Sequence, residues 1–328
     1  TLTRKDFTVA SIKTLIRGPK GSTASLLVLR GKNTLPVKVT RGKIPVPSID
    51  AAYMIDQTTG YIKLSKFSET SYEEFMQNME NLQKQGLKNL VFDLRGNGGG
   101  FMNEAVDIAD EFLDGDKLIV YTEGVNSKKR EYHCKRPGLF ETGKLVLLVN
   151  ETSASASEVL AGALQDWCRA TIIGRRTFGK GLVQEQYQLR DGSAIRLTIA
   201  RYYTPLGRSI QRSYEKGKKV YMDDLWERFN NGELVSEDSM KNHNGKNFTT
   251  NCNDTLYGGG GISPGIFIPV DTSRAQHKAN RMAVTVNVSN YVYNYYLQHK
   301  AEVEKYPNAA GFANGFSQND QLWNGLVQ

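Results

Sequence analysis

Residues 150–184 read NETSASASEVLAGALQDWCRATIIGRRTFGKGLVQ, and the rest of the chain can be interpreted outward from this stretch. The apolar run at 145–149 predicts a strand, which leads into a turn of small polar residues and then an apolar helix from Glu158 to Trp167. Ser155 lies in that turn, beside backbone N–H groups that have no partner inside the helix. An acyl-transfer enzyme would place its nucleophile and oxyanion donors there.

A serine hydroxyl is a weak nucleophile until a base takes its proton. Histidine is the usual base, but no histidine of this chain stands in a motif: His133, His243, His277 and His299. Lys180 lies between two glycines in FGKG, which could hold its amine in a dry pocket. Loss of water lowers a lysine pKa, and the neutral amine is a competent base. Gln184 could orient that amine by a hydrogen bond without adding charge.

Both features also have an ordinary structural interpretation. Ser155 followed three residues later by Glu158 is the pattern of a helix capping box. A lysine between two glycines is usually a solvated loop residue. The serine and the lysine therefore become informative only together, and together with a third stretch.

The third stretch is LVFDLRGNGGGF at 90–101. It predicts a strand, a glycine-rich turn and an amphipathic helix that begins near Asn103. Glycines at this place leave backbone N–H groups approachable, which suits a phosphate or an oxyanion. The spacings of nucleotide-binding glycine motifs are absent. A tight turn that needs positive φ angles is the alternative interpretation.

Four strings in this order resemble the C-terminal processing peptidase (tail-specific protease) family, which are S41-type serine peptidases: DLRGNGGG, SASASEVLAGALQD, TFGKGLVQ and YYTPLGRSIQ. The resemblance covers residues 17–211 and resumes at 257–269. It implies an α/β fold with a ClpP/crotonase-like peptidase core and a PDZ domain. Residue by residue, it implies that Ser155 is the nucleophile, that Lys180 is the base and that Gln184 orients the lysine.

The resemblance also implies an oxyanion hole, made by the N–H of Ala156 and by that of Gly99 or Gly100. It implies polypeptide substrates, either unfolded or cut near their C-termini, with no cofactor, no metal and a homo-oligomer as one possible assembly. It implies a periplasmic or cell-envelope location. The family usually has an aspartate where this chain has Gly265, which affects a local turn contact and not the chemistry.

The resemblance and the element pattern together predict four parts. Residues 1–47 are expected to form the C-terminal half of a PDZ-like domain, with a helix at 7–16 and a hairpin of strands 24–30 and 35–40. Half a PDZ groove cannot add a peptide as a strand, so we expect no tail binding by this unit. A peptidase core is expected at 48–211, a polar and mobile insertion at 212–256, and a glycine loop with a helical extension at 257–328.

The core pattern alternates strands and helices, which favours a mainly parallel sheet with helices outside. Ligands of such sheets lie beyond the carboxyl ends of the strands, where the glycine turn and Ser155 would meet. The expected strands are 61–66, 89–94, 117–122, 145–149 and 170–173, with helices at 72–85 and after the glycine turn. An antiparallel pair is expected at 184–188 and 194–203, and residues 275–303 are expected to be helical.

Composition narrows the remaining function classes. The 328 residues carry a net charge of +8 with scattered basic residues and no aromatic–basic motif, which does not favour nucleic-acid binding. The sequence contains no run of eighteen apolar residues, so it predicts no membrane-spanning helix. The opening TLTRKDF lacks an initiator Met and a signal peptide, so we expect a processed or truncated chain. Cys134, Cys168 and Cys252 show neither metal-ligand spacing nor a disulfide framework, and Cys168 is expected in the core.

Two alternative functions remain open from the sequence. A crotonase-like enzyme would act on acyl thioesters, but the Ser155 and Lys180 pair has no task there. A non-catalytic peptide- or ligand-binding member of the same fold would need neither side chain, and both are present. A serine endopeptidase is therefore the interpretation that uses all of the motifs.

Overall fold

The computed structural model describes residues 9–42, 46–215, 217–237, 239, 246–271, 286–307, 311–312, 315–316 and 324. Backbone contacts divide the chain into two units, between Ser48 and Ile49. The first unit contains helix α1 (Val9–Ile16) and the antiparallel hairpin of β1 (Thr23–Arg30) and β2 (Asn33–Thr40). The predicted helix and hairpin are confirmed, except that Phe7 and Thr8 lie outside the described residues.

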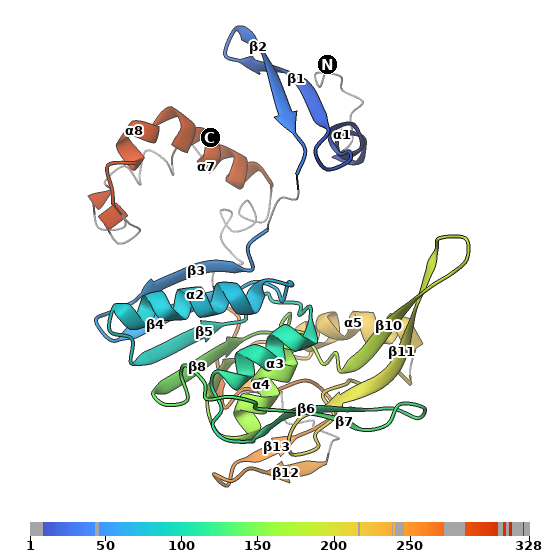
Figure 1. The fold of residues 1–328 in the computed structure, drawn as a ribbon. Helices are drawn as coiled ribbons and strands as arrows, with labels where there is room; N and C mark the ends of the chain where they lie inside the picture. Colours follow the sequence, from blue (N-terminus) through green and yellow to red (C-terminus); the bar gives the residue numbers. More distant parts are fainter. Residues whose placement is uncertain are drawn as a thin grey trace. The chain divides into compact units, whose positions relative to one another are not determined.

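The second unit is built on a six-stranded sheet in the order β14-β9-β8-β5-β4-β3 (Figure 1). Its strands are β3 (Ile49–Met54), β4 (Thr59–Leu64), β5 (Asn89–Asp93), β8 (Lys144–Val149), β9 (Thr171–Gly174) and β14 (Ile266–Phe267). All pairings are parallel except that of β3 with β4. The sequence analysis included these residues in the peptidase core but did not predict β3, since its first expected core strand was 61–66.

A second sheet is antiparallel, in the order β10-β11-β6-β7. Its strands are β6 (Leu118–Glu123), β7 (Arg130–His133), β10 (Leu182–Gln188) and β11 (Ala194–Tyr203). The β10–β11 hairpin confirms the predicted pair. The expectation that 117–122 continues the parallel sheet is wrong: β5 pairs directly with β8, and β6 pairs with β7 and β11. A strand's period shows that it is half buried but does not show which sheet it joins.

Three helices pack on the six-stranded sheet: α2 (Ser71–Lys84), α3 (Met102–Asp110) and α4 (Ala156–Asp166). Helices α3 and α4 pack on each other and also contact β6 of the second sheet, so they lie between the two sheets (Figure 1). Every residue of α4 is buried. This explains why α4 is apolar almost all round, as expected of a helix inside a core.

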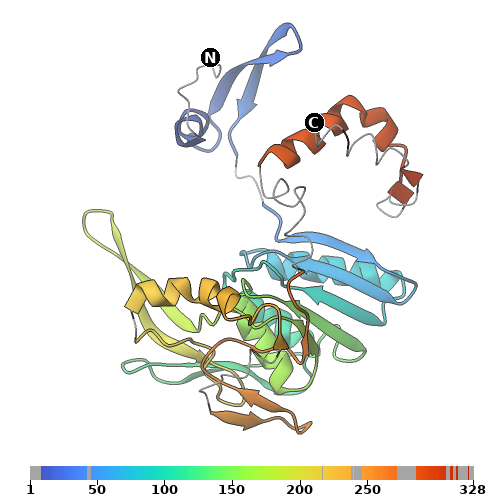
Figure 2. The same cartoon turned by 180° about the vertical axis from the view of Figure 1, so that it is seen from behind.

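The segment predicted as a mobile polar insertion is ordered over much of its length. It contains helix α5 (Gly217–Asn230) and the hairpin of β12 (Asn247–Thr249) and β13 (Thr255–Tyr257). Arg228 of α5 is buried, and ion pairs join it to Asp224 and Glu233. Helix α5 is therefore part of the packed structure, as Figure 2 also shows.

Cys168 and Cys252 form a disulfide that joins the end of α4 to the β12–β13 hairpin. The expectation of no disulfide, and of a core position for Cys168, is therefore wrong: both cysteines are exposed, and Cys134 is the buried free thiol. The sequence separation of 84 between the two cysteines hid the pairing from spacing arguments.

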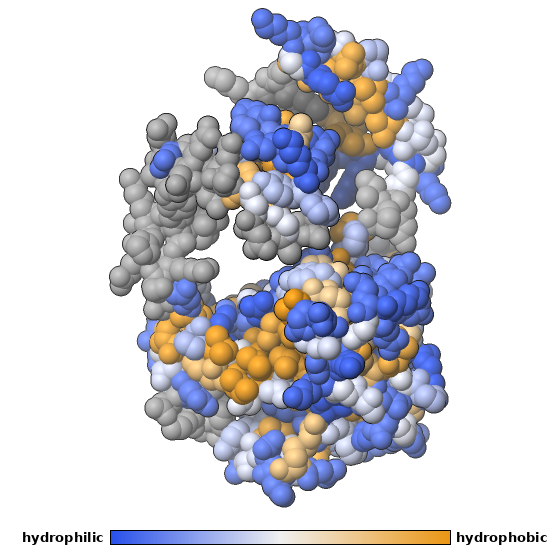
Figure 3. Space-filling model, turned by 90° about the vertical axis from the view of Figure 1, so that its left-hand side faces the viewer, coloured by the Kyte–Doolittle hydropathy of each residue, from blue (hydrophilic) through white to orange (hydrophobic). Residues whose placement is uncertain are grey.

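The C-terminal region contains α7 (Val286–Gln298) and the short α8 (Lys300–Val303). These confirm the helical prediction for 286–303, whereas 275–285 lie outside the described residues. In the part of the chain that is described, no helix has the length and apolarity that crossing a bilayer requires. Hydrophobic residues do reach the surface, and some of them gather on the face seen in Figure 3, which is ordinary for folded proteins.

Candidate active site

Ser155 occupies a strained turn between β8 and α4. It is the N-cap residue of α4, with φ 59° and ψ −113°, a conformation that costs free energy in a residue with a Cβ. Strain of this kind gathers at functional sites because the surrounding structure must hold it in place. The next N–H, that of Ala156, opens the helix and so has no acceptor within it.

The glycine turn packs directly against this serine turn. A Cβ at Gly99 would lie 2.5 Å from the carbonyl oxygen of Ala154 and 2.7 Å from Cβ of Ser155, so only glycine fits there. The carbonyl oxygen of Asn97 accepts hydrogen bonds from the N–H of Ala154 (3.0 Å) and from the hydroxyl of Ser157 (2.9 Å). Two segments far apart in sequence therefore form one site.

The two glycines left open for the oxyanion hole differ in their hydrogen bonding. The N–H of Gly99 donates to Oδ1 of Asn97 at 2.9 Å. Among the residues that the structure describes, no acceptor is bonded to the N–H of Gly100. The amides of Ala156 and Gly100 are therefore the two that remain available to an oxyanion.

The buried carboxylate of Glu158 joins the serine turn to the lysine segment. Its Oε2 accepts the N–H of Ser155 and the N–H of Lys180, both at 2.8 Å. Its Oε1 accepts the N–H of Gly179 at 2.6 Å and the hydroxyl of Thr177 at 2.5 Å. Because one oxygen binds both amides, the backbone nitrogens of positions 155 and 180 lie within two hydrogen-bond lengths of each other.

The side chain of Glu158 is fully buried. Burial raises its pKa, and the four hydrogen bonds that it accepts oppose this shift. The sequence analysis interpreted Glu158 only as the third residue of a capping box. Its bonds to Thr177, Gly179 and Lys180 cross to another segment, which local sequence pattern cannot show.

The side chains of Lys180 and Gln184 are both exposed. The expectation of a dry pocket around Lys180 is therefore wrong for this structure. Within the described residues, no hydrogen bond joins the Lys180 amine to the Ser155 hydroxyl or to Gln184. Nε2 of Gln184 instead lies 3.5 Å from Oγ1 of Thr198 on β11. The structure thus brings the backbones of positions 155 and 180 together and leaves the lysine amine in water.

Asp93 anchors the strand end that precedes the glycine turn. Its carboxylate accepts hydrogen bonds from the Arg95 guanidinium, at 2.6 to 3.1 Å, and from the Tyr61 hydroxyl at 2.7 Å. Burial raises the pKa of Asp93, but these donors outweigh it and hold the pKa below the ordinary value. Burial and the neighbouring Asp93 also raise the pKa of Tyr61 to about 12.

Asp93→Asn is expected to lower the free energy of unfolding by about 1–3 kcal/mol at neutral pH, because the amide loses the charge-assisted bonds to Arg95. The folded pKa of Asp93 lies below its unfolded pKa, so this stabilisation exists above the unfolded value and is lost as pH falls through the folded value. In urea titrations the difference between the two proteins should therefore shrink as pH falls below about 4. The exposed Asp50→Asn serves as control, and an Asp93→Asn difference independent of pH would contradict the assignment.

Two of the four histidines, His133 and His299, lie among the described residues, and both contact groups other than Ser155. The ring nitrogens of His133 contact Asp116 and Glu131 on the surface, and His299 stacks on Tyr295. His243 and His277 lie outside the described residues. Over the described ranges, no three His, Cys, Asp or Glu side chains converge as a metal site would require.

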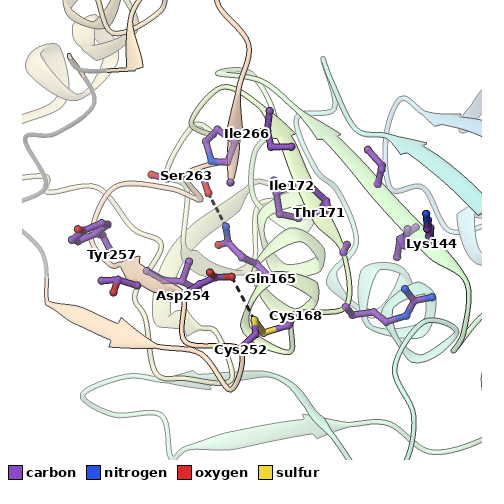
Figure 4. Close-up of a pocket in the computed structure, with 18 of the residues that line it drawn as sticks. Lys144, Gln165, Cys168, Thr171, Ile172, Cys252, Asp254, Tyr257, Ser263 and Ile266 are labelled. Carbon is purple, nitrogen blue, oxygen red and sulfur yellow. Dashed lines mark hydrogen bonds between the residues drawn. A yellow bond between two sulfur atoms is a disulfide. The ribbon is translucent and has the colours of Figure 1, made fainter.

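A cavity of about 890 Å³ lies away from the predicted site residues (Figure 4). It is lined by the first residues of β8 and β9, among them Leu145 and Thr171, and by the Cys168–Cys252 disulfide. Ser155 follows the opposite, carboxyl end of β8. The cavity and the serine turn therefore belong to different ends of the sheet.

The segments that form this site also lie in the part of the chain that matches a known protein family. The model of the family described as Peptidase family S41 matches residues 58–217. The carboxyl-terminal-processing protease of Synechocystis sp. is 39% identical over 203 residues, 60% of this chain and 47% of the relative. The protein of the same name from Picosynechococcus sp. is 42% identical over 201 residues, 60% of this chain and 48% of the relative. This chain thus spans about half the length of these curated relatives.

Among solved structures, the photosystem II D1 C-terminal processing protease is similar, with a TM-score of 0.50 and 27% sequence identity. The similarity covers 82% of this chain and 61% of that protein. Residues 58–217, which match the S41 family model, include the glycine turn, the serine turn and the lysine segment. Residues 58–217 of this chain are therefore a domain of peptidase family S41, and they are similar in sequence to the carboxyl-terminal-processing proteases.

Proposed function

We propose that this chain is a serine endopeptidase that uses a Ser155–Lys180 dyad to cleave polypeptides, near the C-termini of protein substrates. The observation that carries the proposal is the shared hydrogen bond to Glu158, whose Oε2 binds the amides of both residues. A nucleophile at a strained helix N-terminus and a lysine segment bound to the same carboxylate form an arrangement suited to acyl transfer.

The proposed reaction begins when an extended polypeptide covers the site. The bound chain removes water from the Lys180 amine, which favours the neutral amine over the ammonium. Lys180 then takes the proton of the Ser155 hydroxyl, and the serine oxygen attacks the scissile carbonyl carbon. Exposure of Lys180 in the present structure thus corresponds to the enzyme before substrate binds.

The amides of Ala156 and Gly100 stabilise the negative oxygen that forms, each donor contributing about 3–4 kcal/mol to the transition state. Lys180 next gives its proton to the leaving amine, and the C–N bond breaks to leave an ester on Ser155. Water, deprotonated by Lys180, hydrolyses this ester and restores the serine. Gln184 orients the lysine amine once Lys180 has turned toward Ser155.

The exposed Cys168–Cys252 disulfide supports a location outside the reducing cytosol, because disulfides persist in oxidising compartments. We accordingly propose a periplasmic or cell-envelope location. We propose that residues 1–47 are part of a PDZ-like unit, whose helix and hairpin are consistent with that fold.

The proposal is tested by active-site labelling with a fluorophosphonate, which phosphonylates activated serines. The chain should digest casein, and digestion should stop in proportion to the fraction of Ser155 that mass spectrometry finds modified. Digestion that continues with Ser155 fully modified would overturn the assignment. A folded chain that neither digests casein nor reacts with the probe would instead support the non-catalytic binding member.

A further inference from the structure

The segment that carries Lys180 is held from two sides by different parts of the chain. Its amides face the serine turn: the N–H of Phe178 donates to the carbonyl oxygen of Ser153 at 2.9 Å, and those of Gly179 and Lys180 donate to Glu158. Its carbonyls accept hydrogen bonds from elsewhere. Helix α5, which continues beyond the end of the S41 match at residue 217, supplies most of those donors.

Arg228 of α5 is the main donor to these carbonyls. Its Nη1 donates to the carbonyl oxygens of Thr177 at 2.8 Å and Arg176 at 3.2 Å, and its Nη2 donates to that of Phe178 at 3.3 Å. Its Nε lies 2.7 Å from the carboxylate of Asp224. The side chain is 1% exposed. A buried guanidinium is costly unless its donors find acceptors. Here three successive backbone carbonyls accept hydrogen bonds from the two Nη atoms, whereas Nε has the ion pair with Asp224 but no hydrogen bond.

Arg212 binds the next carbonyl group along the segment. The backbone N–H of Arg212 donates to the carbonyl oxygen of Gly179 at 3.0 Å. Its guanidinium lies 4.2 Å from the ring centre of Phe178 and 4.3 Å from that of Tyr221 on α5. A Cβ at Gly179, whose φ is 85°, would lie 2.3 Å from Cγ of Arg212. The glycine before Lys180 thus permits this close approach.

Figures 1 and 2 both show α5 beside the base of the β10–β11 hairpin, the hairpin that follows Lys180 in the chain. All four carbonyls from Arg176 to Gly179 accept bonds from Arg228 or Arg212, while the amides from Phe178 to Lys180 bind the serine side. The backbone before Lys180 therefore cannot shift relative to the serine side or to α5 without breaking a hydrogen bond.

We propose that α5 is a positioning element of the dyad and that Arg228 is a positioning residue, which acts by fixing the backbone that places Lys180 opposite Ser155. This inference rests on the proposed dyad. It assigns the positioning of Lys180 to a helix of which only the first residue, Gly217, lies within the S41 match. Arg228 does not touch the substrate. Its loss should therefore slow the proton transfer and leave substrate binding almost unchanged.

The test compares Arg228→Met and Arg228→Lys with Glu227→Gln, an exposed position on the same helix. Arg228→Met should lower kcat for a peptide substrate by roughly 10- to 100-fold, with KM changed less than about twofold, because a misplacement of about 1 Å costs that much. Arg228→Lys keeps the positive charge but not the several N–H donors of the planar guanidinium, so its kcat should lie between those of Arg228→Met and the wild type. Glu227→Gln should behave as wild type.

A cycle with Lys180→Ala separates positioning from general destabilisation. The rate of Ser155 phosphonylation is measured for each protein at a temperature where far-UV circular dichroism shows it folded. If Arg228 acts through Lys180, Arg228→Met should slow labelling in the wild-type background and change it less than about twofold in the Lys180→Ala background. Equal fold losses in both backgrounds, or an unchanged kcat in a folded Arg228→Met, would overturn the inference.

If Arg228→Met does not fold, Arg228→Lys and Asp224→Asn carry the same comparison, since Asp224 holds the Arg228 Nε. Hydrogen exchange gives a readout that does not depend on activity. The backbone amides of Phe178 to Lys180 should exchange faster in these variants than in Glu227→Gln. Unchanged exchange would argue against the proposal that the Arg228 hydrogen bonds fix this segment. Failure of the dyad itself would appear differently, as wild-type protein whose Ser155 does not react with the probe.

Discussion

Ser155→Ala and Lys180→Ala should each lower the turnover of an unfolded protein substrate at least about 10³-fold, because nucleophile and base act as one unit and the loss of either removes the covalent pathway. The double variant should be scarcely slower than either single variant for the same reason. Casein digestion at matched protein concentration, followed by release of soluble peptides, measures the effect. Ser155 and Lys180 differ in exposure, so the two variants also differ in how they disturb the fold.

The matched control for the lysine is Lys144→Ala. Lys144 is also exposed, but it begins β8, whereas Ser155 follows the end of that strand. This control should retain wild-type turnover. Digestion by Ser155→Ala at more than about one hundredth of the wild-type rate would contradict the nucleophile assignment, since the residual rate of a serine peptidase without its nucleophile is far lower.

Glu158→Gln should lower both stability and activity. The carboxylate accepts two hydrogen bonds on each oxygen, so the amide NH₂ of glutamine would face two donors that then lack an acceptor. Each buried donor left without an acceptor costs about 1–3 kcal/mol. The loss also frees the lysine segment from the serine turn, so turnover should fall even in the fraction that remains folded.

Glu73→Gln is the control for this substitution. Glu73 holds the third position of α2, as Glu158 does in α4, but its side chain is exposed. Urea unfolding should show a loss below about 0.5 kcal/mol for this exposed position. Equal destabilisation by the two substitutions would mean that the loss of a carboxylate from the first turn of a helix, and not the link to Lys180, explains the importance of Glu158.

Local sequence pattern predicted those parts of the fold that depend on local forces. The strand, turn and helix around Ser155 follow from an apolar run, small polar residues and a second apolar run, and β8 and α4 lie where the pattern places them. The β10–β11 hairpin follows from alternation around Asp191 and Gly192. The pattern could not assign β6 to its sheet, because pairing depends on partners distant in sequence.

The disulfide and α5 illustrate the same limit. Cys168 and Cys252 stand 84 residues apart, and only packing of the β12–β13 hairpin on the end of α4 brings them together. A polar composition suggested that α5 was mobile. One of its polar residues, Arg228, is instead buried against backbone carbonyls, which composition does not distinguish from solvated charge.

The sequence by itself determined the chemical groups of this protein: a serine at a helix start, a lysine between glycines and a glycine turn after a strand, because each is a local arrangement with a local pattern. Only the tertiary structure decided how they meet, since Asn97 joins the glycine turn to the serine turn and Glu158 joins the serine turn to the lysine segment. It also decided which glycine N–H remains available. A buried polar group must find partners wherever the folded chain provides them, and those partners lie far away in sequence.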